Sequence, residues 1–238
     1  MKKETINTIL RRTSLLCLFL AMFGATASAQ DEKFEASFGV GYTAASGFDI
    51  DPVVILGTSV NKVGMHSGFA YNFQGDFLFG ENTSVGFLFS RQDSKLTLRG
   101  ASPFSGGLQT VTLADMPVYN YQFPFTYNFL DADAKLRPFL FFGLGWTQFS
   151  PGAVNASLPA LPAGRDLQTS NKFSVAMGGG VKYFVTPKFG VKGMARWTPT
   201  YITSEADGYW CNFYYCAVAS DYKYANQGEF TGGLFVRF

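Results

Sequence analysis

The one histidine of this sequence, His66, is the first candidate for enzymatic chemistry. Ser67 follows it directly, and neighbouring side chains of an extended strand point to opposite faces, so the two cannot form a nucleophile and base on one strand. A dyad would need Ser90 or another serine brought in by folding, and no spacing indicates that. We expect a solvated or interfacial histidine in a protein that is not an enzyme. A lipid-modifying enzyme centred on His66 is the least favoured alternative.

Two cysteines near the end of the chain offer a second kind of chemistry. Cys211 and Cys216 enclose Asn-Phe-Tyr-Tyr, and a disulfide closing this loop would stabilise the fold by about 2 kcal/mol on the loop-entropy model. A metal site is less expected, because two thiols without a nearby histidine leave the coordination shell incomplete, and we expect no cofactor. Four aromatic residues here, Tyr209, Trp210, Phe213 and Tyr214, either belong to a membrane-interface girdle or form a contact surface. A contact surface is favoured for Phe213 and Tyr214.

Charged residues also recur at alternate positions inside segments that are otherwise apolar. If these segments are strands of a closed barrel, the charges share the interior, where they are tolerated only when paired and hydrogen-bonded. The expected interior charges are Glu35, Asp76, Glu229, Arg137, Lys172, Lys182, Lys192, Arg196 and Arg237. We favour an ion-pair plug that fills the interior. The alternative is a narrow pathway for small anions, since the positive charges outnumber the negative ones.

Strict alternation of side-chain type identifies the elements that must position these charges. In the first segment Phe34, Phe38 and Tyr42 share one face, while Glu35 and Thr43 share the other. Seven further segments repeat this pattern, each with a length of the order needed to cross a bilayer at a tilt. The eight predicted strands are residues 34–43, 69–79, 84–90, 118–129, 137–147, 172–183, 189–198 and 229–238.

The predicted connections alternate between short and long. Short turns are expected near residues 80–83, 131–134 and 186–188, whereas the long connections are residues 44–65, 93–116, 150–170 and 200–227. Short turns at one end and long loops at the other are typical of outer-membrane barrels. The run Val53 to Leu56 in the first long loop is either a strand extension or an apolar contact patch.

The orientation of the apolar rows separates a membrane barrel from a soluble one. A soluble barrel turns its apolar face inward and its polar face to water. Here one row of each strand is almost unbroken Phe, Tyr, Val and Leu, and such rows exposed to water would aggregate. Lipid accommodates them, and barrel closure pairs every backbone group. We therefore predict an all-β fold, a closed eight-stranded antiparallel up-and-down transmembrane β-barrel in contact with outer-membrane lipid.

The first residues predict export. A charged leader with Lys2, Lys3, Arg11 and Arg12 precedes a short apolar core and small residues, which is the order of a signal peptide; we expect residues 1–29 to be removed and residues 30–238 to form the barrel domain. After cleavage fifteen basic and sixteen acidic residues remain, so the overall charge gives no reason to expect a nucleic-acid partner.

The end of the chain carries a family resemblance. Thr231, Gly233, Val236 and the terminal Phe238 follow the order of polar residue, glycine, apolar residue and terminal aromatic. This resembles the C-terminal signal of outer-membrane barrels and implies recognition by the barrel-assembly machinery during insertion. The whole expected mature chain resembles the small eight-stranded outer-membrane barrels, which include OmpA-like, OmpX-like and opacity-type proteins, although it lacks the peptidoglycan-binding domain of full OmpA-type proteins.

These observations together predict a surface protein of the bacterial outer membrane. We expect a non-enzymatic anchor with four exposed loops that serve adhesion, interaction with an extracellular partner or envelope integrity. The runner-up is a narrow porin-like channel for small, anionic solutes. Because exposed loops diverge freely around a rigid scaffold, the sequence does not name the partner.

Overall fold

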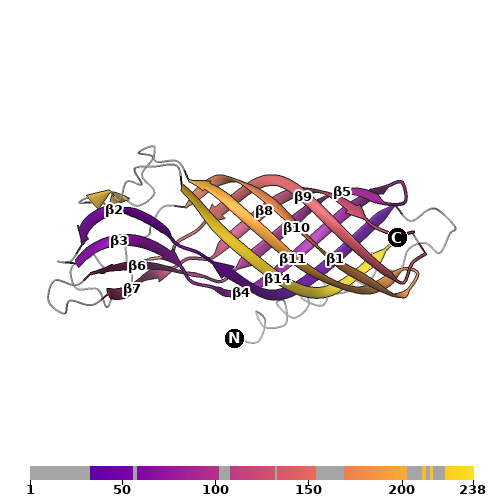
Figure 1. Cartoon of the computed structure of the whole chain (residues 1–238), viewed down its shortest axis with the longest axis horizontal. Coiled ribbons are helices and arrows are strands. Elements are labelled where there is room, and N and C mark those ends of the chain that lie inside the picture. The colour runs from indigo at the N-terminus through magenta and orange to yellow at the C-terminus, as the bar shows by residue number, and fades with distance from the viewer. Residues whose placement is uncertain are drawn as a thin grey trace, which may run out of the picture. The chain divides into compact units, whose positions relative to one another are not determined.

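A computed structural model describes residues 33–55, 58–101, 108–131, 133–153, 169–202, 211–212, 215–216 and 223–238. The predicted signal peptide lies outside these residues. Within them, eight strands form a closed antiparallel barrel (Figure 1), which confirms the predicted fold class. The barrel strands are β1 (Phe34–Ala45), β4 (Gly68–Phe79), β5 (Thr83–Gln92), β8 (Val118–Asn128), β9 (Leu136–Phe149), β10 (Ser170–Thr186), β11 (Phe189–Ile202) and β14 (Lys223–Arg237).

The first and last strands close the barrel. β1 pairs with β14 on one side and β4 on the other, so that Phe38 lies opposite both Leu234 and Phe73. The chain ends meet at this seam, where the amide of Phe34 donates to the carbonyl oxygen of Phe238 at 3.0 Å. Closure leaves no open edge in the barrel sheet, as a lipid environment requires.

Three short connections define one end of the barrel, which we call the turn end. They are residues 80–82, 129–135 and 187–188, and both chain termini of the barrel lie at the same end. Gly80 occupies the left-handed region with φ of 76°, a conformation that glycine adopts without a Cβ penalty. The opposite end, which carries the long connections, is the loop end.

Two of the predicted loops are instead largely β-structure. Residues 44–65 contain β2 (Phe48–Ile55) and β3 (Thr58–Met65), and residues 93–116 contain β6 (Lys95–Ala101) and β7 (Leu108–Asp115). The two hairpins join through β3 and β6 into a four-stranded sheet, in the order β2-β3-β6-β7, at the loop end (Figure 1). The alternation of Lys95, Leu96, Thr97, Leu98 and Arg99 is the signal for this sheet in the sequence.

The last barrel strand also starts earlier than expected, at Lys223 rather than Glu229, and its first residues pair with the end of β11. Between these two strands lie β12 (Cys211–Asn212) and β13 (Tyr215–Cys216), which pair with each other. The barrel wall therefore extends further toward the loop end than the sequence pattern indicated.

Candidate functional site

The turn-end part of the barrel interior holds a three-residue ion cluster. Glu35 on β1 lies between two cations: its Oε1 is 2.5 Å from Lys182 Nζ on β10, and its Oε2 accepts a hydrogen bond from Arg237 Nε on β14 at 2.9 Å. All three side chains are buried. A buried charge is stable only when its partners are present with good geometry, so these strands are fixed to one another through the interior.

A second charged group lies beside the first and is connected through an amide. Gln74 Nε2 donates to both oxygens of Asp76 at 2.9 Å, while its Oε1 accepts from Lys192 Nζ at 2.9 Å. Lys192 also donates to Ser37 Oγ at 3.3 Å. The amide of Gln74 therefore links the carboxylate to the ammonium, and all three side chains are buried.

Aromatic rings fill the space around these cations. The Phe139 ring lies 5.4 Å from Lys182 Nζ and 5.1 Å from Lys192 Nζ, and the Phe184 ring lies 4.5 Å from the Arg237 guanidinium. Such contacts stabilise a desolvated cation. Gly180 on β10, paired with Phe139 on β9, provides room for this ring, since a Cβ there would come within 2.8 Å of Phe139 Cζ.

A third ion pair lies further along the interior. Arg196 on β11 contacts Glu229 on β14 at 2.5 Å and donates to Ser90 on β5. Asn72 donates to the other oxygen of the same carboxylate at 3.1 Å and to Thr231 at 2.9 Å. Four strands thus meet in one buried network across the width of the barrel.

Above this pair the interior contacts are hydrogen bonds between uncharged polar side chains. Thr147 donates to Asn120 Oδ1 at 2.6 Å and contacts Ser174 at 3.0 Å, and Gln122 donates to Ser174 at 2.7 Å. Asn120 in turn donates to Gln227 at 3.2 Å. Hydrogen bonds between side chains of neighbouring and facing strands occupy this level.

An apolar cluster closes the loop end. Val63 and Met65 of β3 and Leu96 of β6 pack against residues from the mouth of the barrel, which ties the four-stranded sheet to the barrel rim. We call this cluster the apolar cap; its buried members are Val63, Met65, Leu96, Met116, Val118, Phe149, Ile202 and Ala225. The interior is therefore occupied from the turn end to the loop end.

The structure places the predicted interior charges as follows. Glu35, Asp76, Lys182, Lys192 and Arg196 are buried and take part in the networks above. Arg137 is also buried, but it binds the turns at the turn end, donating to the carbonyl oxygen of Glu81 at 2.9 Å and to Asn82 Oδ1 at 2.9 Å. Lys172 is half-buried near the loop end.

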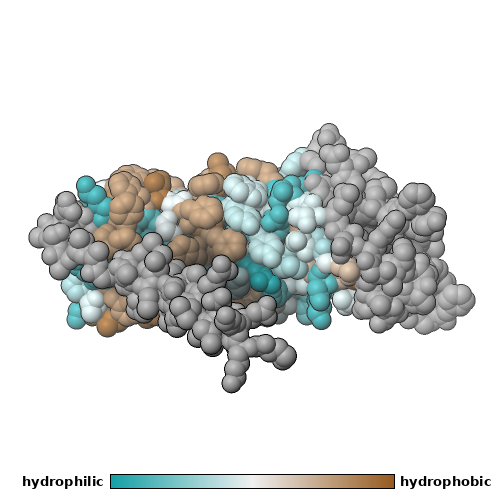
Figure 2. All heavy atoms as spheres, turned by 180° about the vertical axis from the view of Figure 1, so that it is seen from behind, coloured by the Kyte–Doolittle hydropathy of each residue, from teal (hydrophilic) through white to brown (hydrophobic). Residues whose placement is uncertain are grey.

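The outer surface of the barrel is apolar. The large side chains of the alternate rows are exposed, as the pattern predicts, with Phe230 at 63% and Phe123 at 56%. Figure 2 shows one face, where apolar side chains gather over the strands. Aromatic rings contact one another across neighbouring strands toward the loop end, for example Tyr121 and Trp146 with centroids 5.3 Å apart. This surface is suited to acyl chains with an aromatic belt at the interface.

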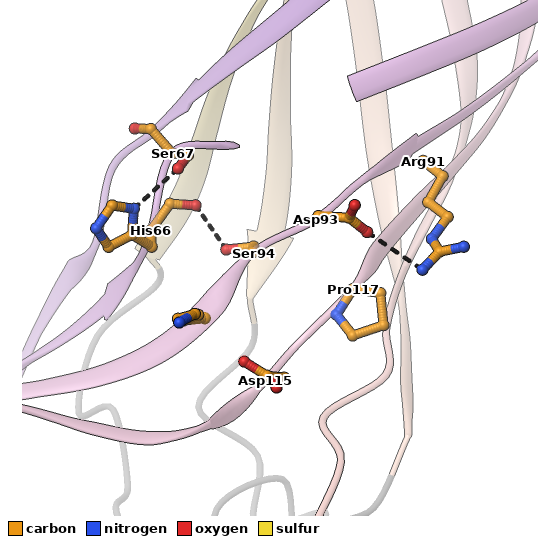
Figure 3. A pocket seen from close by; sticks show the side chains of 8 residues that line it. His66, Ser67, Arg91, Asp93, Ser94, Asp115 and Pro117 are labelled. Atoms are coloured by element: carbon orange, nitrogen blue, oxygen red, sulfur yellow. Dashed lines mark hydrogen bonds and ion pairs between the residues drawn. The ribbon is translucent and has the colours of Figure 1, made fainter. Parts of the chain in front are cut away.

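A pocket of about 440 Å³ lies between the barrel rim and the four-stranded sheet (Figure 3). Its lining residues are His66, Ser67, Arg91, Asp93, Ser94, Lys95, Asp115 and Pro117. His66 Nδ1 is 2.8 Å from the carbonyl oxygen of Ser67, whose hydroxyl accepts from the amide of Ala45. Ser90 bonds to Arg196 in the barrel interior, so neither serine forms a dyad with His66.

The remaining predicted residues lie near the chain end. Tyr209, Trp210, Phe213 and Tyr214 fall outside the described residues. The backbones of Cys211 and Cys216 are directly opposite in the β12–β13 pair, and the disulfide between them stays a prediction. Gly233 and Val236 lie near the end of β14, and Phe238 follows this strand, where its ring stacks on Phe34 with centroids 6.1 Å apart.

Two kinds of feature are not found in the described part of the chain. No group of three or more His, Cys, Asp or Glu residues there is arranged to hold a metal ion. No helix among those residues has the length and hydropathy to cross a membrane.

Comparison with known proteins agrees with this architecture. The family described as outer membrane protein beta-barrel domain matches residues 15–238. Among solved structures, the outer membrane protein OprG from Pseudomonas aeruginosa has a TM-score of 0.60 at 11% identity, covering 88% of this chain and 97% of its own. Neisserial surface protein A has a TM-score of 0.52 at 16% identity, covering 86% and 97%. At these identities the likeness concerns the fold. The curated proteins gave no match.

Proposed function

This chain belongs to the outer membrane protein beta-barrel domain family, and we propose that it is a non-enzymatic surface anchor with a closed interior. As a barrel of the bacterial outer membrane, it has its short turns toward the periplasm and its loop end toward the outside. In this proposal the loop end contacts a partner outside the cell or a neighbouring envelope protein.

One observation carries the proposal, namely the occupation of the interior at every level. From the turn end to the loop end the barrel holds three ion-paired or amide-linked charged groups, then a layer of hydrogen-bonded polar side chains, and finally the apolar cap. An eight-stranded barrel is only wide enough for its own side chains to fill. Conduction would require moving paired buried charges, which is costly.

The loop-end sheet supports a role in contact. β2-β3-β6-β7 is held to the barrel by the apolar cap, so these two long connections form one fixed surface rather than two independent loops. Among the described side chains of β6, Leu96 is buried in the cap, whereas Lys95 and Arg99 are exposed. A preordered surface binds a partner with little entropic cost.

Planar-bilayer recording tests the closed interior. We expect wild-type protein to give no stepwise openings. A variant carrying Glu35→Ala, Lys182→Ala, Arg196→Ala, Glu229→Ala and Met116→Ala removes charged groups at the turn end and the centre together with a cap residue, and it should conduct. Openings of the wild type at the level of this variant would overturn the closed-interior proposal.

A second candidate function is a narrow anion pathway, and the charge count favours it: five buried cations face three buried carboxylates in the described interior. If wild type conducts with a preference for anions that Arg196→Glu abolishes, the pathway replaces the closed anchor. Openings with an unchanged ion preference would instead reject the proposed lining.

Surface contact is tested with proteoliposomes on whole bacterial and animal cells. Liposomes carrying wild type should be retained above empty liposomes, and Arg99→Glu or Cys211→Ser should reduce retention. Glu81→Gln, an exposed change at the turn end, is the matched control and should have no effect. Retention equal to that of empty liposomes on every cell type would count against an adhesive role.

A further inference from the structure

One charged side chain interrupts the apolar outer surface of the barrel. On β5 the outward row runs Val85, Phe87, Phe89 and then Arg91. Among the described side chains, the outward rows of all eight barrel strands hold no other charge. A guanidinium facing lipid is costly at the middle of the bilayer and tolerated only near its interface, so this exception requires a local reason.

The register places Arg91 at the level of the loop-end aromatic belt. Tyr71 on β4 and Tyr119 on β8 lie directly opposite it on the two neighbouring strands. The guanidinium carbon is 5.7 Å from the centroid of the Tyr119 ring, and Phe89 below it stacks near the same ring. Tyrosines at this level mark the headgroup region of the outer leaflet, because the loop end faces outside.

Arg91 also lines the pocket between the barrel rim and the four-stranded sheet (Figure 3). Arg91 Nη2 contacts Asp93 Oδ1 at 3.2 Å, with side chains 37% and 61% exposed, and this contact orients the guanidinium. Its Nε is buried and has no hydrogen-bond partner. Lys95 lines the same pocket, so a second cationic side chain is available there.

We propose that this pocket binds the phosphorylated headgroup of an outer-leaflet lipid, with Arg91 as the main contact and Lys95 as the second. A guanidinium presents a fork of donors that matches phosphate oxygens, and cationic side chains at this depth are suited to lipid headgroups. The acyl chains of such a lipid would lie along the apolar rows below. This inference is independent of whether the barrel interior conducts.

The two carboxylates of the pocket, Asp93 and Asp115, oppose phosphate binding. Asp93 already occupies one donor of Arg91, and a phosphate must compete with it. Asp115 adds a further negative charge to the lining. Removing the Asp93 charge should therefore strengthen phosphate binding. If Arg91 and Asp93 form only a surface salt bridge, the same change would weaken the site or do nothing.

Nanodiscs of phosphatidylcholine that contain a few per cent of lipid A provide the test, with native mass spectrometry to count lipid A bound to the released protein. We expect Arg91→Gln to lower the affinity for lipid A about tenfold, the usual effect of losing one charge-assisted hydrogen bond. Arg99→Gln removes the same charge from the sheet outside the pocket and should bind as wild type. Asp93→Asn should bind more tightly than wild type.

Two further binding measurements identify the ligand. Chemically dephosphorylated lipid A should bind wild type no better than it binds Arg91→Gln, and millimolar inorganic phosphate should fail to displace lipid A. Equal binding of the phosphorylated and dephosphorylated lipids would overturn the proposal, as would displacement by free phosphate, which would indicate a soluble ligand. Weaker binding by Asp93→Asn would also overturn it, and this arm stays informative if Arg91→Gln folds poorly.

Discussion

Replacing Glu35 by glutamine removes the one carboxylate that serves two buried cations. Lys182 Nζ is 2.5 Å and Arg237 Nε 2.9 Å from its two oxygens. Glutamine has nearly the same volume, so the change leaves no cavity and isolates the electrostatic effect. We expect both cations to remain buried without a charged partner, and the barrel to lose stability accordingly.

The expected loss follows from these contacts. Removing one partner of a buried ion pair costs about 3–5 kcal/mol, because the remaining charge stays desolvated. Here the Phe139 ring at 5.4 Å and the Phe235 ring at 6.0 Å from Lys182 Nζ compensate in part. We therefore expect Glu35→Gln to lower the free energy of unfolding by about 3 kcal/mol, at the lower end of that range. Adding Lys182→Met should restore at least about 1 kcal/mol, since it places an apolar chain between two rings.

Urea titration of protein folded into phosphatidylcholine vesicles measures this, with tryptophan fluorescence and the mobility of unheated samples in electrophoresis as independent probes. Glu81→Gln on the exposed 80–82 turn is the matched control and should change stability by less than about 0.5 kcal/mol. A loss below about 1 kcal/mol for Glu35→Gln, or no recovery in the double variant, would refute the assignment of this cluster as a structural plug.

Three further predictions concern packing and covalent structure. Gly41→Ala should lower the free energy of unfolding by about 1–3 kcal/mol or block folding, because its Cβ would lie 1.9 Å from the Phe230 carbonyl oxygen. Gly75→Ala is the control in the same urea titration and should be neutral, since its Cβ would have nothing within 4 Å. Leu96→Ala should cost about 2–5 kcal/mol and accelerate proteolysis of the loop-end sheet, and unchanged cleavage would argue against the cap. Alkylation of unfolded wild type should label two thiols only after reduction, and Cys211→Ser should cost about 2 kcal/mol.

The barrel could be predicted because the alternation within each strand shows which face is apolar and which is polar. In residues 69–74, for example, Phe69, Tyr71 and Phe73 form one face and Asn72 and Gln74 the other, and no information on neighbouring strands is needed. The loop-end sheet was missed because its strands lie within segments treated as connections and one of them, β7, is short of large apolar residues. In β6, polar and apolar residues do alternate from Lys95 to Arg99, which is a strand pattern within the segment predicted as a loop.

The pairings inside the barrel were beyond sequence reasoning for a geometric reason. Glu35 and Lys182 are far apart in the chain and meet only because barrel closure and strand stagger set which inward residues share a level. The alternation assigns each interior charge to a face of its strand but gives no partner. Arg137, for example, binds turn residues rather than a carboxylate. Arg91 lies outside the predicted third strand, which ends at Ser90, whereas β5 continues to Gln92.

The seam between β1 and β14 makes the barrel an all-or-none product of a complete chain. Because β1 finds its second neighbour only in the last fifteen residues, a chain shortened by premature termination has two bare edges that nothing else in the barrel can cover. No smaller, partly finished barrel is available to it. A requirement for a paired final strand at insertion would therefore exclude truncated chains, whatever the state of the other strands.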